Sequence, residues 1–241
     1  MHGLRERKKQ RTRQAIAAAA LRLFIERGFE QVTVAEVAAA AEVAEKTVFN
    51  YFPTKEDLFF ADAAAMDSGV IIDAIRQRPA GESPLDAFRR LLADKPAFEA
   101  EAGQAGPFTP AQLDIHQQAM WVLQRSPALR THLREQFARL EASIADLLAE
   151  ETGAGANDVE PKVAAAALVG VIRAVTDRFL AQAAANQDDQ DRHGLMAALA
   201  EDTTRALDLL ERGLSGYAAA APRPQPAADG TEEEEAGPPS G

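Results

Sequence analysis

The sequence contains no cysteine. Disulfide bonds, thiolate metal ligands and cysteine nucleophiles are therefore excluded. Long apolar runs are missing too. The segment Val163–Ile172 has only 10 residues before Arg173 interrupts it, whereas a membrane-spanning helix needs about 20. We therefore expect a soluble, cytosolic protein.

Motifs of enzyme chemistry are also lacking. The sequence has no glycine-rich phosphate loop, and its serines lie in no nucleophile-elbow motif. The four histidines, at positions 2, 116, 132 and 193, share no metal-ligand spacing with one another or with an acidic residue. We expect no cofactor, no metal site and no catalytic residue.

β-Branched residues are few, and glycine is scarce within the periodic stretches. Alanine, the best helix former, is abundant instead. The chain has 241 residues, of which 46% are hydrophobic, so it is long enough to bury a sizeable core. The composition predicts an all-α protein.

Charge is spread unevenly along the chain. The formal net charge is -11, yet residues 1–55 carry a net charge of +4 and the remainder carries -15. A basic segment can neutralise phosphates, whereas an acidic body resists being wrapped by nucleic acid. We expect residues 1–10 to form a flexible basic arm, and we expect Arg5, Lys8 and Lys9 of the arm and the adjacent Arg11 to contact DNA.

Apolar residues at three- and four-residue spacing predict the first helices. These cover residues 11–27, 34–40, 45–52 and 54–76. Gly28 is placed to end the first helix. Thr33 and Glu36 have the spacing of a capping box at the start of the second. The short helices 34–40 and 45–52 are joined by the tight turn 41–43.

Two short helices, a tight turn and a basic arm are the parts of a helix-turn-helix DNA-binding domain, which we place at residues 11–55. The second helix of such a domain enters the major groove. Its outward residues should be Glu45, Lys46, Thr47, Asn50 and Tyr51. Asparagine can make a bidentate contact to adenine, while Tyr51 and the nearby Lys55 suit phosphates. Thr33 lies at a helix N-terminus, which favours an anion.

From Phe24 to Phe59 the sequence resembles the TetR family of transcriptional regulators. The most specific part runs from Thr47 to Leu58, with its threonine, two aromatics, lysine, glutamate and leucine. The resemblance implies phosphate contacts from Thr33, Thr47, Tyr51 and Lys55. It implies base contacts from Glu45, Lys46 and Asn50.

Two positions depart from the family pattern. Ala44 stands where a serine often caps the recognition helix, and the missing cap costs about 1 kcal/mol. Glu42 stands where the turn often has glycine. If its backbone is left-handed, a non-glycine residue costs about 1 kcal/mol or more.

The remaining chain predicts a helical ligand-binding and dimerisation domain over residues 56–216, followed by a disordered acidic tail over 217–241. Its helices should cover residues 84–101, 110–125, 127–151, 160–185 and 192–214. The last two carry apolar stripes. They can pack within the monomer or pair with their two-fold mates in a four-helix dimer interface, and the resemblance implies the dimer.

Aromatic residues of this domain are either ordinary core or the lining of an effector cavity between helices. The candidate effector contacts are Phe88, Phe108, Trp121 and Phe137. Arg173 and Asp177 are i,i+4 neighbours that predict an intrahelical ion pair or a pair facing the ligand. The order of the helices is similar to that of regulators that sense acyl-CoA-like molecules, so we expect a small apolar or amphipathic effector.

The sequence thus predicts a dimeric, ligand-responsive repressor that binds a near-palindromic operator in double-stranded DNA. Three alternatives remain open. The chain could be a helical small-molecule-binding protein with a degenerate DNA module, a transcriptional activator, or a helical enzyme. Binding to duplexes at several salt concentrations, a reporter assay and a turnover assay distinguish them.

Overall fold

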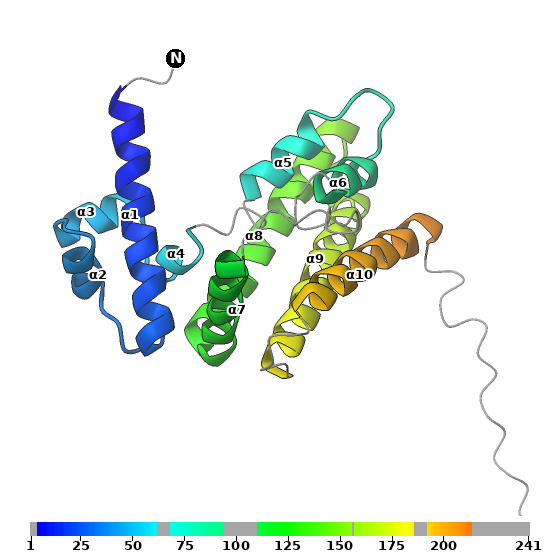
Figure 1. Cartoon of the computed structure of the whole chain (residues 1–241). Coiled ribbons are helices and arrows are strands. Elements are labelled where there is room, and N and C mark those ends of the chain that lie inside the picture. The colour runs from blue at the N-terminus through cyan, green and yellow to red at the C-terminus, as the bar shows by residue number, and fades with distance from the viewer. Residues whose placement is uncertain (1–3, 62–67, 94–109, 156, 186–191, 214–241) are drawn as a thin grey trace, which may run out of the picture.

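The computed structural model describes residues 4–61, 68–93, 110–155, 157–185 and 192–213. These residues form ten α-helices and no strand, which confirms the all-α class. Figure 1 shows them in two groups, a head built from α1 to α4 and a body built from α5 to α10. No helix among these residues is both long and apolar enough to cross a bilayer. The predicted acidic tail lies outside the described residues.

The head is a bundle of one long helix and three short ones. Its elements are α1 (Leu4–Arg27), α2 (Val34–Ala40), α3 (Glu45–Tyr51) and α4 (Lys55–Phe59). The small apolar residues of α1 leave room for large side chains from the short helices. The buried core of the head contains Ile16, Phe24, Val37, Val48, Phe52 and Leu58. The helix-turn-helix therefore rests on α1.

Local signals in the sequence set the ends of the short helices. The Thr33 hydroxyl accepts a hydrogen bond from the Glu36 amide, and the Glu36 carboxylate accepts one from the Thr33 amide, so the predicted capping box forms. Ala44 is the N-cap of α3 and makes no side-chain cap bond. Glu42 has a left-handed backbone with φ of 54°. Both expected departures from ideal local geometry are therefore present.

Two predictions about the head were wrong. The first helix begins at Leu4 instead of Arg11, so residues 4–10 are helical and form no flexible arm. The segment contains only good helix formers after Gly3. The predicted helix 54–76 is interrupted, because α4 ends at Phe59 and α5 begins at Ser68. At the break, Phe59 packs toward Phe24, whereas Phe60 stacks on His132 of the body.

The body is organised around two long helices, α8 (Pro127–Thr152) and α9 (Glu160–Ala185), which pack side by side. The other body helices are α5 (Ser68–Arg76), α6 (Pro84–Ala93), α7 (Pro110–Arg125) and α10 (Arg192–Arg212). Leu133, Phe137, Leu140 and Ile144 form a buried stripe on α8 at helical spacing. Pro127 separates α7 from α8, and Ser126 caps the new helix by accepting from the Leu129 amide.

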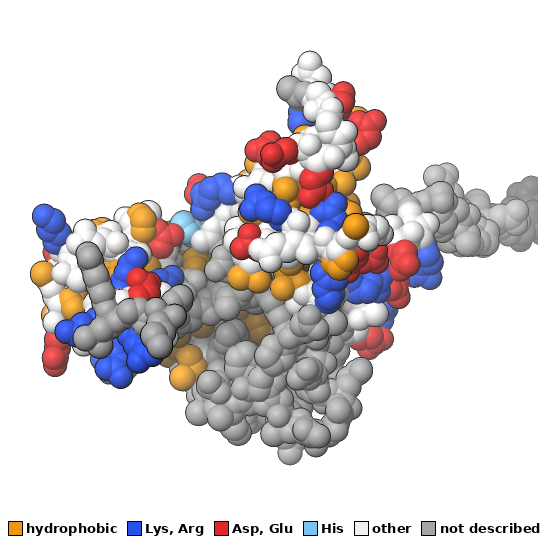
Figure 2. Space-filling model, turned by 90° about the horizontal axis from the view of Figure 1, so that it is seen from above, with side chains coloured by type: hydrophobic (Ala, Val, Ile, Leu, Met, Phe, Trp, Pro, Cys, Tyr) orange, Lys and Arg blue, Asp and Glu red, His pale blue; other side chains and the backbone are white. Residues whose placement is uncertain are grey.

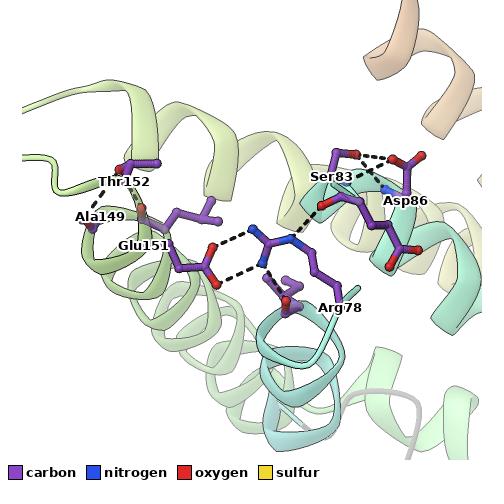
Figure 3. A network of polar contacts seen from close by, with 9 residues as sticks. Arg78, Ser83, Asp86, Ala149, Glu151 and Thr152 are labelled. Atoms are coloured by element: carbon purple, nitrogen blue, oxygen red, sulfur yellow. Dashed lines mark hydrogen bonds and ion pairs between the residues drawn. The ribbon is translucent and has the colours of Figure 1, made fainter. Parts of the chain in front are cut away.

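Arg78 joins three parts of the body (Figure 3). Its guanidinium makes a bidentate ion pair with Glu151 near the end of α8, with N–O distances of 3.0 and 2.6 Å. It also donates to the carbonyl of Ile75 in α5 and to that of Glu82 in the following loop. A planar guanidinium suits this arrangement because its donors form a rigid fork. Arg78 therefore fixes the turn between α5 and α6 against α8.

Replacing Arg78 with methionine keeps the side-chain stem but removes all four bonds. We expect a loss of about 1–2 kcal/mol of unfolding free energy, reduced from the buried-pair range because the pair is partly exposed. Urea titration followed by circular dichroism measures it. The control is Arg76→Met, which removes a more exposed pair with Asp73 at 3.5 Å. Equal losses in the two variants would contradict the role given to Arg78.

Candidate nucleic-acid interface

The recognition helix α3 has one buried side and one exposed side. Val48 points into the core of the head. Glu45, Lys46 and Asn50 are exposed, while Thr47 and Tyr51 are half-buried. Neither Thr47 nor Asn50 is sealed from solvent. The helix therefore presents hydrogen-bonding side chains of the kind that read base edges in the major groove.

Positive charge lies on the N-terminal part of α1. Lys8, Lys9 and Arg11 are exposed on α1. On the face seen in Figure 2, Lys and Arg side chains lie along the head at the left of the picture. The side chain of Arg5 lies outside the described residues. Because these cations project from an ordered helix, they are held in a fixed register with the recognition helix.

Lys55 has a structural role that the sequence did not predict. Its Nζ donates to the carbonyl of Phe29 at 2.6 Å and lies 4.2 Å from the centre of the Phe29 ring. It also lies 5.9 Å from the ring centre of Phe24. Burial lowers the pKa of Lys55 from its ordinary value. Lys55 therefore fastens α4 to the end of α1. Its contact with a phosphate stays a prediction.

Thr33 and Glu36 form an electrostatic cluster at the start of α2. Besides the capping bonds, the Glu36 carboxylate accepts from the Thr33 hydroxyl and from Arg27, both at 2.8 Å. The backbone amide and the hydroxyl of Thr33, followed by Arg27, lower the pKa of Glu36 from 4.5 to about 2. The cluster ties the end of α1 to the first helix of the helix-turn-helix.

This cluster predicts a pH dependence of stability. The pKa of Glu36 is lower in the folded state, so its stabilisation is present above about pH 4.5 and is lost as the pH falls toward 2. Glu36→Gln should lower the unfolding temperature at pH 7 and flatten its decline between pH 5 and 2.5. The control is Glu26→Gln, an exposed carboxyl of α1. Parallel pH profiles for wild type and Glu36→Gln would contradict the prediction.

Phe49 belongs to the exposed surface of α3 and is not among the residues predicted to contact DNA. Its side chain is 47% exposed, which makes it the one large hydrophobic residue so exposed among the described part of the head. The helical spacing of the neighbouring residues predicts this exposure. Val48 and Phe52 are four residues apart and face inward, so Phe49 has to project from a neighbouring side, next to Asn50. An exposed aromatic ring there can contact a thymine methyl group.

Within the described residues, the candidate effector side chains do not gather around one large cavity. Phe88 and Phe137 are buried in the packed core, and Trp121 is exposed near the head. Phe108 lies outside the described residues. Between α5, α8 and α9 the structure shows a cavity of about 10 Å³, smaller than any drug-sized ligand.

The predicted pairing of Arg173 with Asp177 was wrong. Arg173 forms an ion pair with Glu141 of α8 at 3.4 Å, and Asp177 is exposed. Helix α9 packs on α8, which brings Glu141 within reach of Arg173. The pairing therefore depends on tertiary packing that residue spacing within one helix cannot reveal.

Two short helices joined by a tight turn, a recognition surface and a cationic first helix together define a helix-turn-helix DNA-binding protein with a helical body. The chain belongs to the TetR family. The model for "Bacterial regulatory proteins, tetR family" matches residues 16–61, and that for the "MftR C-terminal domain" matches residues 82–215. The protein is therefore a TetR-type transcriptional regulator.

Several known proteins are similar to this chain. The HTH-type transcriptional regulator TcmR of Streptomyces glaucescens is 31% identical over 184 residues, covering 75% of this chain and 78% of TcmR. Among solved structures, GusR of Salmonella enterica is 22% identical with a TM-score of 0.44, covering 83% of this chain and 95% of GusR. Thermus thermophilus FadR, solved with lauroyl-CoA, is 26% identical with a TM-score of 0.43, covering 87% of this chain and 98% of FadR.

Proposed function

We propose that this TetR-type regulator is a dimeric, ligand-responsive repressor that reads a near-palindromic operator. The observation that carries the proposal is the exposed side of α3, where Lys46, Phe49 and Asn50 lie together. Two copies of α3 related by a two-fold axis would enter successive major grooves about 34–36 Å apart. Binding to DNA, without catalysis, is the proposed activity, and it would take place in the bacterial cytoplasm.

The proposed dimer uses α9 and α10. Leu168 and Leu207 are buried within the monomer, but Val175 and Leu210 are only half-buried. Val163 is largely exposed near the start of α9. The side chains of Leu195 and Leu199, and residue Leu214, lie outside the described residues. Incomplete burial of an apolar face in one copy supports pairing with a second copy.

The effector class stays open to experiment. An acyl-CoA-like effector is the proposed class, and FadR of Thermus thermophilus was solved with lauroyl-CoA. A drug-sized ligand would require the core around Phe137 to open, because the cavity found there holds about 10 Å³. Repression and activation are separated by a reporter gene under the operator, with expression compared in the presence and absence of the regulator.

Selection from a pool of randomised duplexes tests the DNA-binding proposal. We expect enrichment of a near-palindromic sequence, bound with a steep salt dependence. Asn50→Ala should lower the preference for one base pair in each half-site by about 1–3 kcal/mol. The matched control is Asn157→Ala, which makes the same change on an exposed loop of the body. No enrichment, or unchanged preference in Asn50→Ala, would contradict the assigned site.

A second test addresses Phe49. If its ring covers a thymine methyl group, replacing that thymine with deoxyuridine should weaken binding by about 0.8 kcal/mol, or roughly fourfold. Phe49→Ala should weaken binding to the thymine duplex and remove the difference between the two duplexes. Fluorescence anisotropy of labelled operators measures both effects. If every deoxyuridine substitution is neutral for the wild-type protein, Phe49 does not read a methyl group.

A further inference from the structure

A cleft of about 190 Å³ lies where the head meets the body. Its head side is the loop that follows α1, and its body side is the last turn of α7 together with the residue that caps α8. Figure 1 shows α7 beside the lower half of α1. The lining residues are Gly28, Phe29, Glu30, Gln31, Trp121, Val122, Arg125 and Ser126.

Apolar packing, the stack of Phe60 on His132 and a few polar contacts join head and body near the cleft. The hydroxyl of Ser126 donates to Oε1 of Glu30 at 2.7 Å, and Ser126 is only 2% exposed. Further along α8, His132 Nε2 lies 3.3 Å from Oδ1 of Asp57 in α4. A molecule in the cleft would therefore contact both the head and the body.

Apolar side chains lie at the base of the cleft, and an aromatic side chain lies at its edge. Phe29 and Val122 are buried beneath it, whereas Trp121 is 45% exposed. An exposed tryptophan beside a hollow offers a flat surface on which a planar ring gains both burial and offset stacking. A cavity of this size admits a single substituted ring and excludes a long acyl chain.

Two charged residues line the cleft, and Arg125 is the one that can pair with an anionic ligand. The Arg125 guanidinium lies 4.5 Å from the Trp121 ring centre, and no carboxylate in the described part of the chain pairs with it. Glu30, the other charged lining residue, already accepts a hydrogen bond from Ser126. A carboxylate could form the fork of two hydrogen bonds that a guanidinium favours.

We infer that this cleft binds a small aromatic carboxylate, with its ring against Trp121 and its carboxylate on Arg125. The ligand would bridge head and body, so its affinity depends on the angle between them. By linkage, a ligand that prefers one angle changes the affinity for operator DNA by the same factor. This regulatory part rests on the proposed function, whereas binding at the cleft does not.

The first test uses 4-fluorobenzoate and needs no DNA. Fluorine NMR of the ligand should show saturable broadening with the full-length protein. Trp121 is the single tryptophan of the chain, so the same titration should change the intrinsic tryptophan fluorescence with the same midpoint. 4-Fluorobenzamide and 4-fluorobenzylamine, which are neutral and cationic, should each bind at least tenfold more weakly. An equal or stronger response to the amine would overturn the assignment to Arg125.

Two arginine variants locate the ligand. Arg125→Gln should weaken binding of 4-fluorobenzoate at least tenfold. The matched control, Arg130→Gln, changes an exposed arginine of α8 outside the cleft and should leave binding unchanged. Absence of saturable binding to the wild-type protein would refute the site, as would equal affinities for wild type and Arg125→Gln.

The final measurement separates the site from its regulatory consequence. With the selected operator, saturating 4-fluorobenzoate should shift the wild-type dissociation constant at least threefold, with no shift for Arg125→Gln. Binding at the cleft without a shift would overturn the regulatory inference alone. Failure to select any operator would overturn the proposed DNA-binding function. The NMR and fluorescence titrations would still show whether 4-fluorobenzoate binds at the cleft.

Discussion

A seven-residue helix has almost no stability of its own in water, because isolated helices shorter than about 12–15 residues are marginal. Helix α3 is that short, and its N-cap Ala44 contributes no side-chain bond. It is held in place because Val48 and Phe52 are buried in the core of the head. Arg13 of α1 reinforces this packing, since its guanidinium lies 5.0 Å from the Phe52 ring centre. The exposed polar side of α3 therefore depends on what its other side buries.

Helix α4 is also short and depends on contacts with the rest of the head, which explains the position of Lys55. The ammonium group satisfies the Phe29 carbonyl just beyond the end of α1 and lies over the Phe29 ring. This contact draws α4 against α1 and leaves the next residue, Glu30, beside Ser126 of the body. The short loop with Phe29 and Glu30 thus contacts both the core of the head and the body. A movement of the body at Ser126 can therefore shift this loop, and a movement of the loop can shift Ser126.

Elements encoded by local chemistry could be predicted from the sequence. The bounds of α2, the Thr33 capping box and the exposed Asn50 follow from helical spacing and cap chemistry, and all are present. The contacts of Lys55, the pairing of Arg173 with Glu141 and the position of Trp121 join segments far apart in the chain. Periodicity reports which side of a helix is apolar. It does not report which other helix covers that side, so these contacts could be identified only from the three-dimensional structure.

The contacts between head and body have consequences for regulation because only a few polar groups accompany the apolar packing there. Allosteric coupling between two sites is commonly about 1–3 kcal/mol, which is comparable to one or two hydrogen bonds to charged groups. The hydrogen bond from Ser126 to Glu30 is of that kind. Ser126 also caps α8, the long helix on which the body core is built, so its hydroxyl serves the helix and the joint at once. Rearrangement of the body at the start of α8 would therefore alter the bond to Glu30, and the orientation of the recognition helix would change without any change in the core of the head.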